Sequence, residues 1–165
     1  MTRLRAVAFA AALAATGAAA QAPTFTVRSL TPEAALKVAQ AALAKCRAQG
    51  YQVAVAVVDR GGLTQVLLRD QLAGPHTLDV AANKAWSAVS FRTHTKDLER
   101  LTRPGESMSG LRQLPRFVAI GGGMIIEGGG SLVGGIGVSG APGGDADHAC
   151  AAAGIAAISE DLELQ

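Results

Sequence analysis

Three histidines carry the most versatile chemistry in this chain: His76, His94 and His148. An imidazole can bind a metal ion or transfer a proton near neutral pH. The three are not spaced as an HxxxH pair, and the sequence has no His-Glu metal motif. His76 lies in the segment GPHT, between an expected strand and an expected helix, where ligand contacts are common. It is either a ligand-binding residue or a solvated histidine at a helix start.

Two basic residues flank apolar stretches near the same expected cleft, Arg69 and Lys84. Either of them can hold a ligand carboxylate, because guanidinium and ammonium groups form charge-assisted hydrogen bonds with it. The alternative is that each is a solvated charge or a member of a surface ion pair. The sequence favours neither interpretation over the other.

An acidic cluster near the C-terminus contains Asp145, Asp147 and His148. Their closeness suggests a metal site. The favoured interpretation is a capped helix start, with Asp145 as the cap, where the helix dipole stabilises acidic side chains.

A glycine motif, GIGVSG at 135–140, matches the pattern GxGxxG. A dinucleotide fingerprint needs these glycines between a strand and the next helix. Here they fall within and at the end of an expected strand, and Pro142 intervenes before the next helix. Glycines in a strand instead indicate close approach of a ligand or another backbone. Ser139 lacks the flanking glycine of a nucleophile elbow, and no nucleophile, base and oxyanion donor share a recognisable spacing, so an enzyme is not the favoured class.

The two cysteines lie on the apolar stripes of the expected first and last helices. Cys46 and Cys150 can form a disulfide if those helices pack together in an oxidising compartment. Otherwise they are small buried hydrophobic residues. The sequence leaves both alternatives open, because it does not supply the Cα–Cα distance on which pairing depends.

The elements that must position these residues follow from periodicity and turn signals. Hairpins imply an antiparallel sheet, and amphipathic helices must cover its faces. We therefore predict a single-domain α/β (α+β) fold, a five-stranded antiparallel sheet flanked by helices, in the order α-ββ-α(α)-βββ-α. The expected helices are 32–49, 76–90, 95–101 and 146–160, the expected strands are 53–58, 63–69, 117–120, 124–127 and 132–139, and 102–115 is an expected loop.

The N-terminus has the layout of a secretory signal peptide: a basic start at 1–5, an apolar run at 6–16, then small residues. We expect a signal peptide over 1–22, cleaved near 20–22, then an extended segment at 23–30 and the domain at 31–160. The apolar run is shorter than the ~20 residues of a membrane span. The protein is therefore expected to be periplasmic or secreted, without stable membrane insertion.

Composition restricts the classes of protein to which this chain can belong. The 165 residues suffice for one ordinary domain, and 49% hydrophobic with 17% charged residues indicates a globular chain. Without the two arginines of the expected signal peptide, 13 basic residues face 13 acidic ones. Such a neutral protein lacks the basic footprint of a nucleic-acid binder, so no nucleic-acid partner is expected.

Three segments stand out together: VAVAVVDRGGLTQVLLRD (53–70), AGPHTLDVAANKAWSAVSF (73–91) and GGGMIIEGGGSLVGGIGVSGAPGGDADHACAAAGIAAI (121–158). In combination they resemble the GlcG/HbpS family, which includes the C-terminal domain of PduO-type adenosyltransferases. The resemblance implies a five-stranded antiparallel sheet flanked by helices and an oligomeric assembly. It also implies haem as the suspected cofactor, since some members bind haem and some are described as haem-degrading or redox-sensing.

The resemblance carries over to individual residues only in part. PduO-type members place a haem-ligating histidine on the first helix, and this chain has none between Thr31 and Gly50. His76 is then the remaining candidate for an axial ligand, with Arg69 or Lys84 near a propionate. The positions that fall on the family pattern, most of them expected to be structural, are Asp59, Gly62, Arg69, Lys84, Gly137, Ser139 and Gly140.

These observations lead to two functional hypotheses. The first is an exported haem- or tetrapyrrole-binding protein that acts in haem storage, sensing or slow degradation. The second is a metal-free binding module for a small carboxylate or another metabolite, accessory to a catabolic pathway. In either case we expect a homo-oligomer, because Ala-rich helices and Gly-rich strands allow close subunit packing. The expected ligand-binding residues are Arg69, His76, Lys84, Gly137, Ser139 and Gly140.

Overall fold

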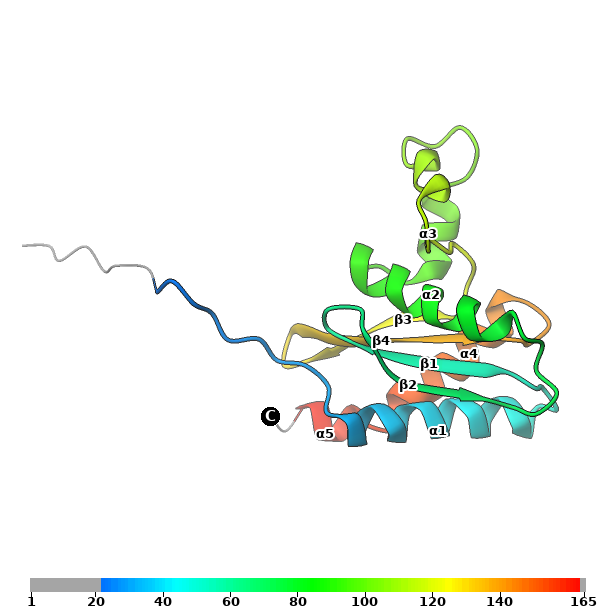
Figure 1. The fold of residues 1–165 in the computed structure, drawn as a ribbon, viewed down its shortest axis with the longest axis horizontal. Coiled ribbons are helices and arrows are strands. Elements are labelled where there is room, and N and C mark those ends of the chain that lie inside the picture. The colour runs from blue at the N-terminus through cyan, green and yellow to red at the C-terminus, as the bar shows by residue number, and fades with distance from the viewer. Residues whose placement is uncertain (1–21, 164–165) are drawn as a thin grey trace, which may run out of the picture.

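Four strands form one antiparallel sheet in the order β2-β1-β4-β3 in the computed structural model, which describes residues 22–163 (Figure 1). Two hairpins, β1-β2 and β3-β4, meet where β1 pairs with β4, with Ala56 opposite Gly137. The expected signal peptide lies outside the described residues except for its last position. The strands are β1 (Ala54–Asp59), β2 (Thr64–Arg69), β3 (Gly123–Gly128) and β4 (Ser131–Ser139).

Helices cover both faces of this sheet. In Figure 1, α1 and α4 lie against one face, and α2 lies across the other. This arrangement explains why β1 is an unbroken apolar run, since its residues are buried from both sides. The described helices are α1 (Pro32–Ala48), α2 (Thr77–Phe91), α3 (Thr95–Leu101), α4 (Gly144–Ala156) and α5 (Ser159–Glu163), with a short 3-10 helix at Ser109–Gln113 within the expected loop. The predicted single-domain α+β class is confirmed.

Helix α1 begins as its sequence predicts. The Thr31 hydroxyl accepts a hydrogen bond from the backbone N–H of Ala34 at 3.2 Å, and Pro32 occupies the first helical position. Leu36 is 40% exposed and does not belong to the buried face. The face that packs on the sheet consists mainly of small residues, including Ala35, Val38, Ala39 and Ala42, so the helix can approach the strands closely.

The predicted fifth strand is absent from the described residues. Over Phe117–Ile120, the backbone N–H of Val118 donates to the Ser87 hydroxyl on α2 at 2.9 Å, and that of Phe117 donates to the carbonyl of Leu114. These N–H groups are bound by a helix side chain and a turn, so they do not join the sheet. The prediction of five strands is therefore wrong, and the sheet has four.

The C-terminal helix also differs from the prediction of one helix over 146–160. Helix α4 begins at Gly144, and a turn after Ala156 separates it from α5. Gly143 is the N-cap residue, and Asp145 lies in the first turn. The expectation that Asp145 caps the helix is wrong, while its expected place near the positive end of the helix is confirmed.

Close packing of α2 on the sheet accounts for two glycines of β4, Gly135 and Gly137. A Cβ atom at Gly137 would overlap the backbone of α2, at the carbonyl oxygen of Ala81 and the nitrogen of Ala85. The GxGxxG match therefore reflects contact between a strand and the helix that crosses it.

A disulfide joins α1 to α4. Cys46 and Cys150 are both fully buried, with their Cα atoms 5.5 Å apart. The bond fixes α4, whose first turn borders the cavity described below. Within residues 22–163, we find no helix that is both long and apolar enough to cross a bilayer.

Candidate functional site

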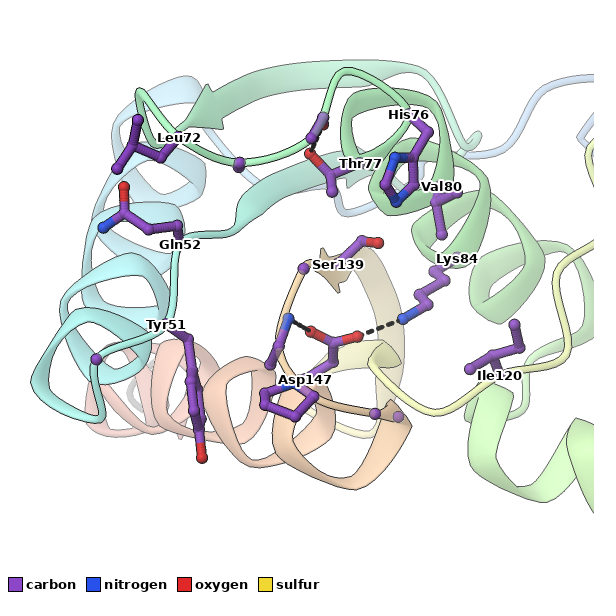
Figure 2. A pocket seen from close by; sticks show the side chains of 18 residues that line it. Tyr51, Gln52, Leu72, His76, Thr77, Val80, Lys84, Ile120, Ser139 and Asp147 are labelled. Atoms are coloured by element: carbon purple, nitrogen blue, oxygen red, sulfur yellow. Dashed lines mark hydrogen bonds and ion pairs between the residues drawn. The ribbon is translucent and has the colours of Figure 1, made fainter.

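A cavity of about 640 Å³ opens between the N-terminal ends of α2 and α4 (Figure 2). Its other walls come from the segment between α1 and β1, from the segment between β2 and α2, and from the end of β4. This volume is typical of small-molecule sites. Ile120, in the segment before β3, also lines the cavity, so four loops and two helix starts converge there.

Four of the six predicted ligand-binding residues line this cavity: His76, Lys84, Ser139 and Gly140. Arg69 is not among its lining residues, because its exposed side chain on β2 turns to donate a hydrogen bond to the carbonyl oxygen of Ala73. Gly137 is not among them either, since it packs beneath α2.

The His76 side chain lies at the mouth of the cavity. His76 is the N-cap residue of α2, and its side chain makes no capping hydrogen bond. The imidazole folds over Gly74, where an added Cβ would lie 2.7 Å from Cε1 of the ring. Neither ring nitrogen hydrogen-bonds to a described residue, and the side chain is exposed (Figure 2). The ring is therefore free to bind a ligand.

A buried ion pair forms the inner wall. Lys84 is 1% exposed and Asp147 is 4% exposed, and Nζ of the lysine donates to Oδ2 of the aspartate at 2.7 Å. The lysine also donates to the carbonyl of Val138 at 2.9 Å, and Oδ1 of the aspartate accepts from the backbone N–H of Ala141 at 3.0 Å. The pair ties α2, β4 and α4 together.

Burial governs the ionisation of this pair. It lowers the pKa of Lys84, although the charge of and hydrogen bond to Asp147 act in the opposite direction. It also raises the pKa of Asp147, against the effects of Lys84 and of the Ala141 N–H. Taking both charges out of water thus outweighs their mutual attraction.

Sequence reasoning missed the partnership of Asp147 with Lys84, since it interpreted the aspartate either as part of a metal site or as an acid stabilised by the helix dipole. A signal was present: Lys84 falls on the apolar stripe of α2 beside Ala81, Ala85 and Ala88. A buried lysine needs an anionic partner. The sequence did not indicate which of the chain's acidic residues that partner is.

The acidic cluster at the start of α4 does not form a metal site. Among residues 22–163, no group of three or more His, Cys, Asp or Glu side chains is arranged to hold an ion. Asp145 instead pairs with Lys96 at 2.7 Å on the surface. The His148 ring meets the His94 ring edge-on, with centroids 6.0 Å apart, and burial lowers the pKa of His148.

The cavity fits some requirements of haem and not others. Leu72, Val80 and Ile120 provide apolar wall, and His76 offers an imidazole of the kind that ligates haem iron. Of the lining residues, Lys84 is the only lysine or arginine, and Asp147 already holds it. A propionate held by Arg69 in this cavity does not fit the observed placement.

Comparison with solved structures finds close similarity over almost the whole described chain. A double mutant of HbpS from Streptomyces reticuli is 39% identical with a TM-score of 0.78, and the match covers 92% of this chain and 99% of that one. The PduO C-terminal domain in complex with haem is 31% identical with a TM-score of 0.74, and the match covers 79% of this chain and 95% of that one.

Sequence comparison gives a consistent result. An uncharacterised 15.0 kDa protein from the dhaT-dhaS intergenic region of Citrobacter freundii is 35% identical over 116 residues, which are 69% of this chain and 82% of that protein. The corrinoid adenosyltransferase PduO of Salmonella typhimurium is 37% identical over 98 residues, 57% of this chain. The match spans only 29% of that longer enzyme.

A family model covers the same region. Residues 30–156 match the model described as "Haem degrading protein HbpS-like". This range includes the sheet, the ion pair and every wall of the cavity. The chain therefore belongs to the HbpS-like family.

Proposed function

We propose that this protein binds haem or a related tetrapyrrole in the cavity, with His76 as the axial ligand. The observation that carries the proposal is an imidazole without a hydrogen-bond partner among the described residues, at the mouth of a cavity with apolar walls. The haem complex of the similar PduO C-terminal domain supports this choice of ligand.

The residues of this chain would bind and orient the group. His76 would donate a ring nitrogen to the iron, and Leu72, Val80 and Ile120 would exclude water from the macrocycle faces. Haem, when bound, supplies redox and oxygen chemistry at its iron. The role we propose is haem storage, sensing or slow degradation.

We further propose that the protein is exported to the periplasm or secreted. The basic, apolar and small-residue segments of 1–22 support this localisation. The Cys46–Cys150 disulfide supports it independently, because such bonds persist in oxidising compartments. Fractionation of cells that express the full chain tests the proposal: a processed, oxidised protein outside the cytoplasm is expected, and an unprocessed cytoplasmic protein would contradict it.

We also propose a homo-oligomer. Large apolar side chains on and beside the edge strand β2 support this, since Leu63 is 70% exposed and Leu67 is 43% exposed. Light scattering after size exclusion should give a mass above that of one chain. A monomeric mass would refute the proposal.

Haem titration followed in the Soret region tests the main proposal. The unmodified protein should show a saturable shift with one haem per chain. His76→Gln should weaken binding and change the Soret maximum, while His94→Gln, remote from the cavity lining, should behave like the unmodified protein. A normal spectrum in His76→Gln would exclude this axial ligand, and no saturable shift in the unmodified protein would exclude haem.

A further inference from the structure

We propose that the floor of the cavity is a carboxylate subsite, formed by the Ser139 hydroxyl, the Lys84 ammonium and the first turn of α4. This inference deepens the proposed function, on whose cavity it rests, by naming the acidic group that the ligand must present. That carboxylate belongs either to a haem propionate or to a small organic acid, and the experiment below distinguishes the two.

The Ser139 hydroxyl has no partner within the described part of the chain. Its side chain is 6% exposed, lies at the end of β4 and points into the cavity (Figure 2). None of the hydrogen bonds of the described residues involves its Oγ. The Oγ atom is not sealed off from the cavity, so a ligand that enters can reach it. A ligand oxygen that accepts its proton would supply that partner.

The first turn of α4 presents backbone donors to the same space. Its N-cap residue, Gly143, has no side chain to cap the helix, whereas Thr31 caps α1. The N–H groups of Gly144, Asp145 and Ala146 consequently lack both an intrahelical acceptor and a side-chain acceptor. Gly143 and Gly144 both line the cavity, and a Cβ at Gly143 would meet only open space. Asp145 and Ala146 are not among the lining residues, so the donor that a ligand in the cavity reaches directly is the N–H of Gly144.

The ion pair at the floor leaves one donor of Lys84 open and neither carboxylate oxygen of Asp147 without a donor. Both carboxylate oxygens of Asp147 are occupied, and its charge is matched by Lys84 at 2.7 Å. Lys84 has three ammonium protons, and described protein acceptors take two of them. Asp145, in the first turn of α4, pairs with Lys96 on the surface, so it does not occupy the donors of the floor. A carboxylate can accept hydrogen bonds from these donors, and it carries a negative charge that the corresponding ester lacks.

The experiment compares haem with haem dimethyl ester, whose propionates carry no charge. The unmodified protein should bind haem roughly tenfold more tightly than the ester, as expected for charge-assisted hydrogen bonds. Ser139→Ala should reduce this ratio several-fold and leave the Soret maximum unchanged, because His76 still ligates the iron. Ser131→Ala, at the exposed start of the same strand, is the matched control and should keep the ratio.

A second measurement works without haem. Sodium propionate, with chloride at the same ionic strength as the reference, should shift the backbone amide resonances of Gly144, Asp145 and Ala146. Ser139→Ala should reduce these shifts, and Ser131→Ala should not. The spectrum also reports whether each variant is folded, so loss of binding is separated from loss of structure.

The outcomes separate this inference from the proposed function. If haem binds but the ester binds equally well and propionate shifts no α4 amide, the subsite is refuted and haem binding stands. If haem gives no Soret shift but propionate shifts those amides in a Ser139-dependent way, the subsite stands, its ligand is a small organic acid, and the haem proposal fails. If neither ligand binds, both are overturned.

Discussion

Removal of one member of the buried ion pair should strongly destabilise the protein. Lys84→Met leaves Asp147 buried at 4% exposure, with the Ala141 N–H as its remaining hydrogen-bond donor among the described residues. Breaking a buried pair in this way costs about 3–5 kcal/mol, because the remaining charge is uncompensated. For a chain of this size, each kcal/mol lowers the melting temperature by roughly 2–4 °C. The expected decrease is therefore about 6–20 °C.

Removal of both charges should recover most of this loss. Burial lowers the pKa of Lys84 and raises that of Asp147, so the intact pair is itself expensive to desolvate. In the double variant Lys84→Met with Asp147→Asn, the amide oxygen can still accept from Ala141. We expect a coupling energy of about 2 kcal/mol or more between the two substitutions.

Urea denaturation of the unmodified protein, the two single variants and the double variant measures both the cost of Lys84→Met and the coupling energy. The matched control is Lys37→Met, which removes a pair of similar length, 2.9 Å to Asp161, whose side chains are 56% and 63% exposed. That control should change stability little, because water screens exposed pairs. A cost below about 1 kcal/mol for Lys84→Met, or additive effects in the double variant, would refute the reasoning.

Three other predictions concern the scaffold and its pH dependence. Replacing Cys46 and Cys150 by alanine should lower the free energy of unfolding by about 2–4 kcal/mol, because the bond spans 104 residues; equal urea midpoints with and without the bond would contradict this. Gly137→Ala should destabilise the fold by about 1–3 kcal/mol or more, since the new methyl group overlaps the backbone of α2, whereas Gly110→Ala meets open space and should melt near the unmodified protein. Burial lowers the pKa of His148 in the folded state, so the unfolded chain takes up its proton first and stability should fall as pH decreases from about 7 to 5. Urea midpoints across this range should vary less in His148→Leu, and an unchanged slope would exclude His148 as the cause.

Local signals in the sequence predicted most of the secondary structure. The helix predicted over 32–49 begins at Pro32 in the structure, and the strands predicted over 53–58 and 63–69 correspond to the first hairpin. The helix predicted over 95–101 has those bounds in the structure. The prediction of a strand over Phe117–Ile120 was wrong because a short apolar run is compatible with a strand. In the structure, the backbone N–H groups of this segment donate to Ser87 and to the carbonyl of a turn. The identity of such partners is not a local property of the chain.

The candidate site was predicted in part for a related reason. His76, Ser139 and Gly140 line one cavity, as their positions at the ends of elements suggested, and Lys84 joins them from the middle of α2. Arg69 also lies at the end of a strand, but β2 is an edge strand and its side chain turns away to the Ala73 carbonyl. Sequence position therefore indicates the end of the sheet at which a residue lies and not the direction of its side chain.

The sequence by itself determined the helix starts, the hairpin turns, the apolar stripes and the family, because these depend on residues near one another in the chain. The tertiary structure alone decided the pairing of Lys84 with Asp147, 63 residues apart, and of Cys46 with Cys150, 104 residues apart. Each pairing requires two elements to pack at a particular distance and rotation. The chemistry of the cavity depends on the same geometry: Lys84 is a partnered cation in its wall because α4 brings Asp147 to within 2.7 Å.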